Sequence, residues 1–240
     1  MARHFRSDKG NLYEGSNSDV EDRLEQDAGN PSGNQADLRE LAEACREPDL
    51  AKRWQLLNRC LDVEKFAAFA AIEVLICHRD GLSLDRNNFR IYHDPTTNNL
   101  VFIPHGMDLI FDNPTAPLES QFRGSVARAL MEMPQGRQMY RRRLKEMGQL
   151  AYGTNWLSVR TSELDRQLRA AFMDEGRKRS FDSSVAQLHE CLRARRAFVR
   201  KQIACMCGAV VGALLGAERW NLIVSKTASD QRKDWRSLLR

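Results

Sequence analysis

The chain has 240 residues, of which 42% are hydrophobic and 29% charged, a balance typical of a folded protein rather than a disordered chain. No run approaches the ~20 apolar residues of a membrane-spanning helix, and residues 1–9 lack the apolar segment of a signal peptide, so we expect no membrane span and no export signal in this sequence. Charge is uneven, because residues 1–120 hold 13 Lys and Arg against 21 Asp and Glu, whereas residues 121–240 hold 24 against 11.

The positive charge of the second half of the chain can indicate a polyanionic partner such as nucleic acid. Its arginine clusters at 141–143 and 193–200 fall within helical patterns, and neither a nucleic-acid motif nor an aromatic platform accompanies them. We therefore expect solvated helix faces and no nucleic-acid partner. Docking of acidic or phosphorylated protein substrates is the alternative use of these positive charges.

The N-terminal region, residues 1–36, is polar and rich in Gly, Asn, Ser and Asp. We expect one short strand there, at 11–14, and otherwise a partly disordered segment. Apolar periodicity then predicts two short helices, at 38–46 and 50–59, with Asp37 as the N-cap of the first.

A longer helix is predicted over residues 63–78. Asp62 precedes it and has the side chain of an N-cap, and its apolar residues occur on every face, so we expect the helix to be largely buried. The triplet His78-Arg79-Asp80 stands at its end.

A β-hairpin is predicted next. Its strands are the aromatic and β-branched runs at 89–92 and 100–103, and residues 94–99 between them are dense in turn formers. Because antiparallel strands bring the start of one beside the end of the other, Asn88 should lie next to residues 104–108 despite their separation in sequence.

Three side chains around this hairpin have the chemistry of a phosphoryl-transfer site. Asp80 can act as a base, while Asn88 and Asp108 offer the oxygen ligands that Mg²⁺ prefers. Protein kinases place a catalytic Asp, a metal-binding Asn and a metal-binding Asp in this order. The interval from Asp80 to Asn88 is longer than in the usual kinase loop, so Asp85 and Asn87 are alternatives for one of these roles.

The sequence resembles the CotH (spore-coat protein H) kinase-like family over about residues 10–150. The matching positions are residues 10–15, 61–66 and 73–75, then Asp80-Gly81, Asn87-Asn88-Phe89, Tyr92-His93-Asp94-Pro95, Phe102-Ile103-Pro104 and Met107-Asp108. The resemblance implies an α+β, mainly helical fold: a protein-kinase-like large lobe with a β-hairpin at the catalytic site. It also implies ATP-dependent phosphorylation of proteins, with Mg²⁺ or Mn²⁺ as the metal.

The sequence departs from the family and from protein kinases in two ways. Many family members carry Trp-Asp-x-Asp where this chain has His105-Gly106-Met107-Asp108, so only the second carboxylate is present. Neither a Gly-rich phosphate loop nor a strand lysine precedes Asp80. We therefore expect the small lobe to be largely missing. The chain would be the catalytic lobe of a longer protein or a truncated copy, weak or inactive alone, with any export or cell-surface signal outside it.

Helices dominate after the hairpin, following a loop at 113–117. They are predicted at 120–132, 135–152, 157–173 and 181–206. The expected organisation is an interlobe remnant at 1–36, a kinase-like helical lobe at 37–206 that contains the hairpin 89–104, and a C-terminal appendage at 207–240.

The sequence thus favours a CotH-like protein kinase acting on Ser or Thr, with Asp80 as base and with Asn88 and Asp108 as metal ligands. Asp108 lies in an apolar run, so we expect its carboxylate to be buried and therefore paired or metal-bound. The residues that could support the site are His78, Arg79 and His105. The alternatives are a kinase-fold pseudoenzyme that serves as a binding or structural module, and a structural helical protein with a chance His-Arg-Asp triplet.

Overall fold

The computed structural model describes residues 4–30, 34–169, 171 and 175–212. Within these residues the chain forms one antiparallel sheet of four strands: β1 (Asn11–Gly15), β2 (Glu25–Ala28), β3 (Phe89–Asp94) and β4 (Asn99–Pro104). The same residues form eight helices: α1 (Ala36–Arg46), α2 (Leu50–Cys60), α3 (Val63–Leu75), α4 (Leu82–Asp85), α5 (Ser125–Glu132), α6 (Pro134–Tyr152), α7 (Trp156–Arg169) and α8 (Glu175–Gly212). The mainly helical class is confirmed.

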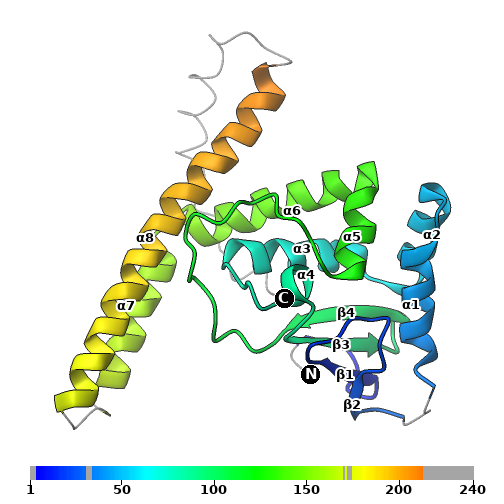
Figure 1. Cartoon of the computed structure of the whole chain (residues 1–240), viewed down its shortest axis with the longest axis horizontal. Coiled ribbons are helices and arrows are strands. Elements are labelled where there is room, and N and C mark those ends of the chain that lie inside the picture. The colour runs from blue at the N-terminus through cyan, green and yellow to red at the C-terminus, as the bar shows by residue number, and fades with distance from the viewer. Residues whose placement is uncertain (1–3, 31–33, 170, 172–174, 213–240) are drawn as a thin grey trace.

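The helices are arranged around one face and two ends of the sheet (Figure 1). Helices α3 to α6 lie over one face of the sheet, α1 and α2 stand side by side at one end, and α7 packs along α8 at the other end. In the described part of the chain, none of the helices combines the length and apolar character needed to cross a membrane.

The N-terminal region belongs to the sheet, which corrects the expectation of a partly disordered segment at 1–36 for its described residues. The strand order is β2-β1-β3-β4, so β1 is an inner strand. Its Tyr13 is fully buried, and Glu14 stands opposite Arg90 of β3, with which it forms an ion pair. The region is therefore ordered by pairing with β3, a strand that lies far along the sequence. Glu14 and Arg90, for example, are 76 positions apart.

The predicted hairpin is confirmed as β3 and β4, and the predicted helices are all present with shifted ends. The helix expected at 63–78 ends at Leu75, the one expected at 120–132 begins at Ser125, and the one expected at 181–206 is the longer α8. The boundary expected between 206 and 207 falls inside α8, and residues 213–240 of the expected appendage lie outside the described residues.

One predicted N-cap is confirmed and the other is wrong. Asp62 caps α3, and its side chain accepts the Lys65 N–H at 3.1 Å. The residue that precedes α1 is Gln35, so Asp37 lies inside the first turn of the helix. Asp37 instead accepts hydrogen bonds from groups on the strands, because β1 and β3 run past the start of α1.

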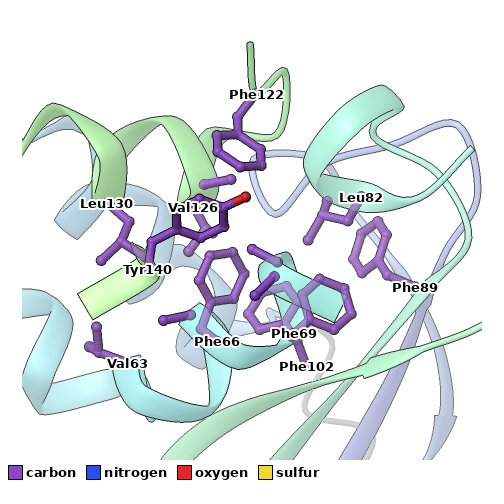
Figure 2. Close-up of a cluster of buried hydrophobic side chains, with 14 of the residues drawn as sticks. Val63, Phe66, Phe69, Leu82, Phe89, Phe102, Phe122, Val126, Leu130 and Tyr140 are labelled. Carbon is purple, nitrogen blue, oxygen red and sulfur yellow. The ribbon is translucent and has the colours of Figure 1, made fainter. Parts of the chain in front are cut away.

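The core lies between α3 and the sheet. The rings of Phe66 and Phe69 on α3 contact Phe102 of β4, with centroid distances of 4.8 and 5.7 Å, and Phe89 of β3 stacks on the other side of Phe102 at 6.2 Å (Figure 2). Side chains from α5 and α6, such as Tyr140, close the cluster from above. Burial of α3 is confirmed, and this aromatic cluster fixes α3 against the hairpin.

A buried arginine joins α8 to this core. Arg195 is fully buried, and its guanidinium donates to the carbonyls of Val74 at 2.6 Å, Leu75 at 3.0 Å, Ala116 at 2.5 Å and Pro114 at 3.2 Å. The first two carbonyls belong to the last turn of α3, where the helix dipole is negative. The cation is thus stabilised by backbone oxygens, and it ties α8 to both α3 and the loop after β4.

A polar contact joins α1 to the sheet. The Nδ1 atom of His93 lies 2.8 Å from Oδ2 of Asp37, and this hydrogen bond raises the pKa of His93 above its ordinary 6.5. Burial would raise the pKa of Asp37, but hydrogen bonds from His93, Tyr13 and Asn11 outweigh burial and lower this pKa below 3.8. The stabilisation from His93 is therefore complete below about pH 6.5 and is lost as pH rises through the raised pKa, whereas the stabilisation from Asp37 is lost only in acid.

We expect His93→Gln to lower the free energy of unfolding at about pH 5.5 and to lower it much less at about pH 9, because the charged form of His93 supplies the attraction to Asp37. Urea denaturation of both proteins at the two pH values measures the effect. A loss of the same size at both values would contradict the assignment.

Candidate functional site

Asp80 lies on the turn that follows α3. The helix stops short of the predicted end because Cys77 takes a left-handed conformation, with φ of 55°, and the His78 N–H then donates to the Glu73 carbonyl at 2.8 Å. The turn leaves Asp80 partly exposed beside the start of α4.

Two asparagine amides hold the Asp80 carboxylate. Asn88 Nδ2 donates to Oδ2 of Asp80 at 2.6 Å and to the Asp80 carbonyl at 3.1 Å, and Asn87 Nδ2 donates to Oδ1 at 3.0 Å. The alternative Asp85 points elsewhere and forms an ion pair with Arg123. The structure thus brings Asp80 and Asn88 into contact and places Asn87 beside them.

Asn88 and Gly106 face each other at the open end of the hairpin, opposite its turn. Phe89 pairs with Pro104, and the His105 N–H donates to the Asn88 carbonyl at 3.3 Å. Asn88 and Gly106 both have left-handed backbones, with φ of 50° and 55°, and a Cβ at position 106 would lie 2.5 Å from Oδ1 of Asn88. This Oδ1 accepts no hydrogen bond from the described residues, so its lone pairs are available to a ligand.

Asp108 is exposed, which corrects the expectation of a buried carboxylate. Its neighbours Met107 and Leu109 are 45% and 40% exposed, so this apolar run is a surface loop. Asp108 forms neither a hydrogen bond nor an ion pair with a described residue. The charges of Asp80 and Asp108 both act to raise the pKa of His78, although burial lowers it more strongly. One imidazole therefore lies within electrostatic range of both carboxylates.

A buried glutamate and histidine lie beneath the turn, and both are 0% exposed. The Glu73 carboxylate accepts the backbone N–H groups of Leu82 at 3.0 Å and Ser83 at 2.9 Å. His78 Nε2 lies 3.3 Å from the Gly106 carbonyl, and its Nδ1 lies 3.8 Å from Oε1 of Glu73. His78 therefore joins the Asp80 turn to the segment that leads to Asp108.

Glu73 lies in the matching stretch 73–75, but no role at the site was predicted for it from the sequence. The signal was present, because Glu73 is the only charged residue between positions 66 and 77, on a helix predicted to be buried. Burial raises the pKa of Glu73 to about 7, and contacts with Ser83 and Leu82 offset part of the rise.

The two other residues expected to support the site have partners outside it. Arg79 forms an ion pair with Asp112 at 2.5 Å. His105 Nε2 lies 3.4 Å from Oε1 of Glu14 on β1. These contacts hold the loop after β4 and the end of the hairpin to the body, so both residues serve the local structure.

The oxygen donors fit a hard cation that is shared with a phosphate group. In the described part of the chain, no group of three or more His, Cys, Asp and Glu residues could hold a metal by itself. Mg²⁺ in phosphoryl-transfer sites usually takes one or two protein oxygens and completes its shell with phosphates and water. The Oδ1 of Asn88, which accepts no hydrogen bond from the described residues, and the exposed carboxylate of Asp108 are oxygen donors of this kind.

Comparison with known families identifies the family of the chain. A family profile described as CotH kinase protein matches residues 1–201. The chain belongs to the CotH kinase family. The match includes the whole sheet and the helices through most of α8, a longer span than residues 10–150, on which the resemblance was drawn. No curated protein matches the chain.

Within the CotH kinase family, this chain differs from the Trp-Asp-x-Asp pattern at Gly106, and the structure gives a physical reason why glycine is required here. The backbone at 106 is left-handed, and the Asn88 amide fills the space that a side chain would need. In this structure, a side chain at position 106 would therefore require Asn88 to move.

We expect Gly106→Ala to destabilise the protein by about 2 kcal/mol or more, since an L residue in a left-handed conformation costs about 1–2 kcal/mol and the contact with Asn88 adds to it. In an Asn88→Gly background, Gly106→Ala should lower the free energy of unfolding only by the cost of the left-handed backbone, because the contact with the Asn88 side chain is absent. Urea denaturation of the four proteins of this double-mutant cycle gives the coupling between the two positions. Purely additive losses would show that the two positions do not compete for space.

Proposed function

We propose that this chain carries the catalytic centre of a CotH-type protein kinase, which transfers a phosphoryl group from ATP, with Mg²⁺ or Mn²⁺, to a Ser or Thr hydroxyl of a protein substrate. The observation that supports this most is the contact between Asn88 and Asp80 at the open end of the hairpin, opposite its turn. Asp108 lies in the loop that leaves the same end. Asp80 is assigned as the base, and Asn88 and Asp108 as the metal ligands.

Asp80 would take the proton of the acceptor hydroxyl. The amides of Asn87 and Asn88 each donate to one carboxylate oxygen of Asp80, which fixes the plane of the carboxylate. An ionised carboxylate has about four lone-pair sites, so both oxygens can still accept the hydroxyl proton. Phosphoryl transfer depends mostly on such positioning and on electrostatic stabilisation.

Asn88 has two functions in this proposal, because its two polar atoms face different groups. Nδ2 orients Asp80, while the free Oδ1 is a ligand for the metal ion. With Asp108, Asn88 would hold a Mg²⁺ or Mn²⁺ ion, which would supply positive charge to the phosphate group. Asp108, which is exposed and unpaired, supplies the carboxylate for it without breaking an existing ion pair.

A kinase-fold pseudoenzyme is the second candidate function, and Gly106 is the observation that favours it. Where many family members have a first carboxylate, this chain has no side chain, and the space is occupied by Asn88. One carboxylate and one amide are a weaker donor set for a divalent cation than two carboxylates. In this case the chain would bind a nucleotide or a partner protein without turnover.

Metal binding can be tested without a substrate. We expect Mn²⁺ or Mg²⁺ with ATP, at about millimolar concentration, to raise the melting temperature of the wild type, because a ligand that binds only the folded state stabilises it by mass action. Asp108→Asn should remove most of this ligand-dependent shift and leave the unliganded melting temperature nearly unchanged, since Asp108 is exposed and unpaired. Asp80→Asn should retain much of the shift, because the base need not bind the ion.

Asp85→Asn is the matched control, since it removes a carboxylate five positions from Asp80 that is paired with Arg123 outside the site. It should retain the full ligand-dependent shift. A wild-type melting temperature that does not respond to metal and ATP would contradict the metal assignment.

Catalysis is a separate question from binding. We expect the 240-residue chain to incorporate little or no labelled phosphate into protein substrates, because the sequence has no Gly-rich loop to cover the phosphates of ATP. The measurement is transfer from γ-labelled ATP, with Asp80→Ala as the control. Strong incorporation that Asp80→Ala abolishes would show that the missing elements are dispensable. A nucleotide-dependent thermal shift without incorporation would favour the pseudoenzyme.

A further inference from the structure

Glu73 is a buried charged group that the proposed mechanism does not use. Its carboxylate is fully buried and accepts the N–H groups of Leu82 and Ser83, the first two residues of α4. It therefore links α3 to the segment that follows Asp80. A carboxylate removed from water needs compensation, and no Lys or Arg of the described residues forms an ion pair with it.

His78 completes this cluster, and its contact with Gly106 fixes the position of its hydrogen. A carbonyl oxygen only accepts, so Nε2, which lies 3.3 Å from the Gly106 carbonyl, must carry the hydrogen. In the neutral imidazole, Nδ1 then presents a lone pair. Nδ1 is buried, has no hydrogen-bond partner among the described residues, and lies 3.8 Å from Oε1 of Glu73.

An ionised Glu73 would place a negative oxygen against this lone pair in a space closed to water. One proton between the two atoms replaces that repulsion with an O–H···N attraction. Gly81 closes the space on another side, since a Cβ there would lie 2.7 Å from Nδ1 of His78 and would also clash with the Glu73 carboxylate. At 3.8 Å the two atoms lie beyond hydrogen-bonding distance, so a proton on the pair would relieve the repulsion by drawing them closer.

We propose that Glu73 is a positioning residue for the Asp80 turn, and that it acts by holding a proton that it shares with His78. Glu73 on α3 binds the start of α4, and His78 binds the Gly106 carbonyl. A proton shared by Glu73 and His78 therefore connects the three elements around Asp80. Loss of the proton as pH rises restores the repulsion and loosens the turn. The consequence for Asp80 rests on the proposed function, whereas the shared proton does not.

The electrostatic surroundings favour the uncharged pair. Burial raises the pKa of Glu73 to about 7, and contacts with Ser83 offset part of the rise. Burial also lowers the pKa of His78, and the charges of Asp80 and Asp108 offset part of the fall. These two carboxylates are the charged groups that act on the pair from the turn and from the loop after β4, and neither contacts it.

The two groups have opposite effects on the pH dependence of stability. The folded pKa of Glu73, about 7, exceeds the ordinary 4.5, so its proton stabilises the folded state fully below about pH 4.5 and this effect is lost as pH rises to about 7. The pKa of His78 is lowered from 6.5, so its contribution increases with pH up to about that value. A matched variant is needed to separate them.

Glu73→Gln is that variant. A glutamine amide nitrogen at the position of Oε1 can donate to Nδ1 of His78 while the amide oxygen keeps the bond from the Ser83 N–H. The bond from the Leu82 N–H is lost, which lowers stability by an amount independent of pH, and the variant cannot titrate. We expect the free energy of unfolding of the wild type, relative to that of Glu73→Gln, to fall between about pH 5 and pH 7.5. The slope against pH should correspond to the release of at most one proton from the folded state. A difference that does not change with pH overturns the proposal.

Carbon-13 and nitrogen-15 NMR of the wild type test the proton directly, and the Glu73→Gln variant serves to assign the signal. We expect one glutamate carboxyl signal to titrate near pH 7, to be missing from Glu73→Gln, and the His78 nitrogen shifts to show hydrogen on Nε2. Titration of the Glu73 carboxyl near its ordinary 4.5, or hydrogen on Nδ1 alone, overturns the proposal.

The thermal shift with Mn²⁺ and ATP tests whether the proton positions Asp80 and its neighbours for the ligand. We expect the shift of the wild type to weaken above about pH 7.5, while Glu73→Gln keeps its shift there. Equal weakening in both proteins overturns the positioning role. Absence of any shift at every pH counts against the proposed function, and the NMR titration then decides the shared proton on its own.

Discussion

The antiparallel pairing of β3 with β4 is the constraint on which the candidate site depends. Phe89 stands opposite Pro104, and this register brings Asn88 against Gly106 and beside Asp80. A slip of one residue would turn every side chain of one strand to the other face of the sheet, taking Phe102 out of the aromatic cluster as well as separating Asn88 from Gly106. Because β1 pairs along the other edge of β3, the register is held from both sides.

The helical layer meets this site at the end of α3. The turn that carries Asp80 begins just after Leu75, whose carbonyl is bound by Arg195 of α8. Arg195 also binds the carbonyls of residues 114 and 116, in the loop that follows Asp108. A displacement of α8 would therefore move both segments of the proposed site. Lysine could not replace this arginine, because a single ammonium cannot reach four carbonyls in the way that a planar guanidinium does.

Features that depend on neighbours along the chain were predictable from the sequence, and features that depend on distant residues were not. The hairpin followed from its β-branched strands and turn formers, and it led correctly to the closeness of Asn88 to His105 and Gly106. The strand β2 has no apolar pattern, so only its pairing with β1 defines it. Asp37 has the side chain of an N-cap, but strands from elsewhere provide its partners. Asp108 lies in an apolar run that no other element covers, and Glu73 became significant only once His78 was placed against it.

The inner position of β1 protects the sheet from other molecules. It pairs with β2 on one side and β3 on the other, so the backbone groups of β3 meet a strand of the same chain. A fragment that began after residue 15 would leave β3 as a bare edge, with buried Phe89 and Ile91 beside unpaired N–H and C=O groups. Such an edge is a template for strand addition by another copy. Truncation to the helical part of this chain would thus be expected to give aggregates rather than a smaller folded protein.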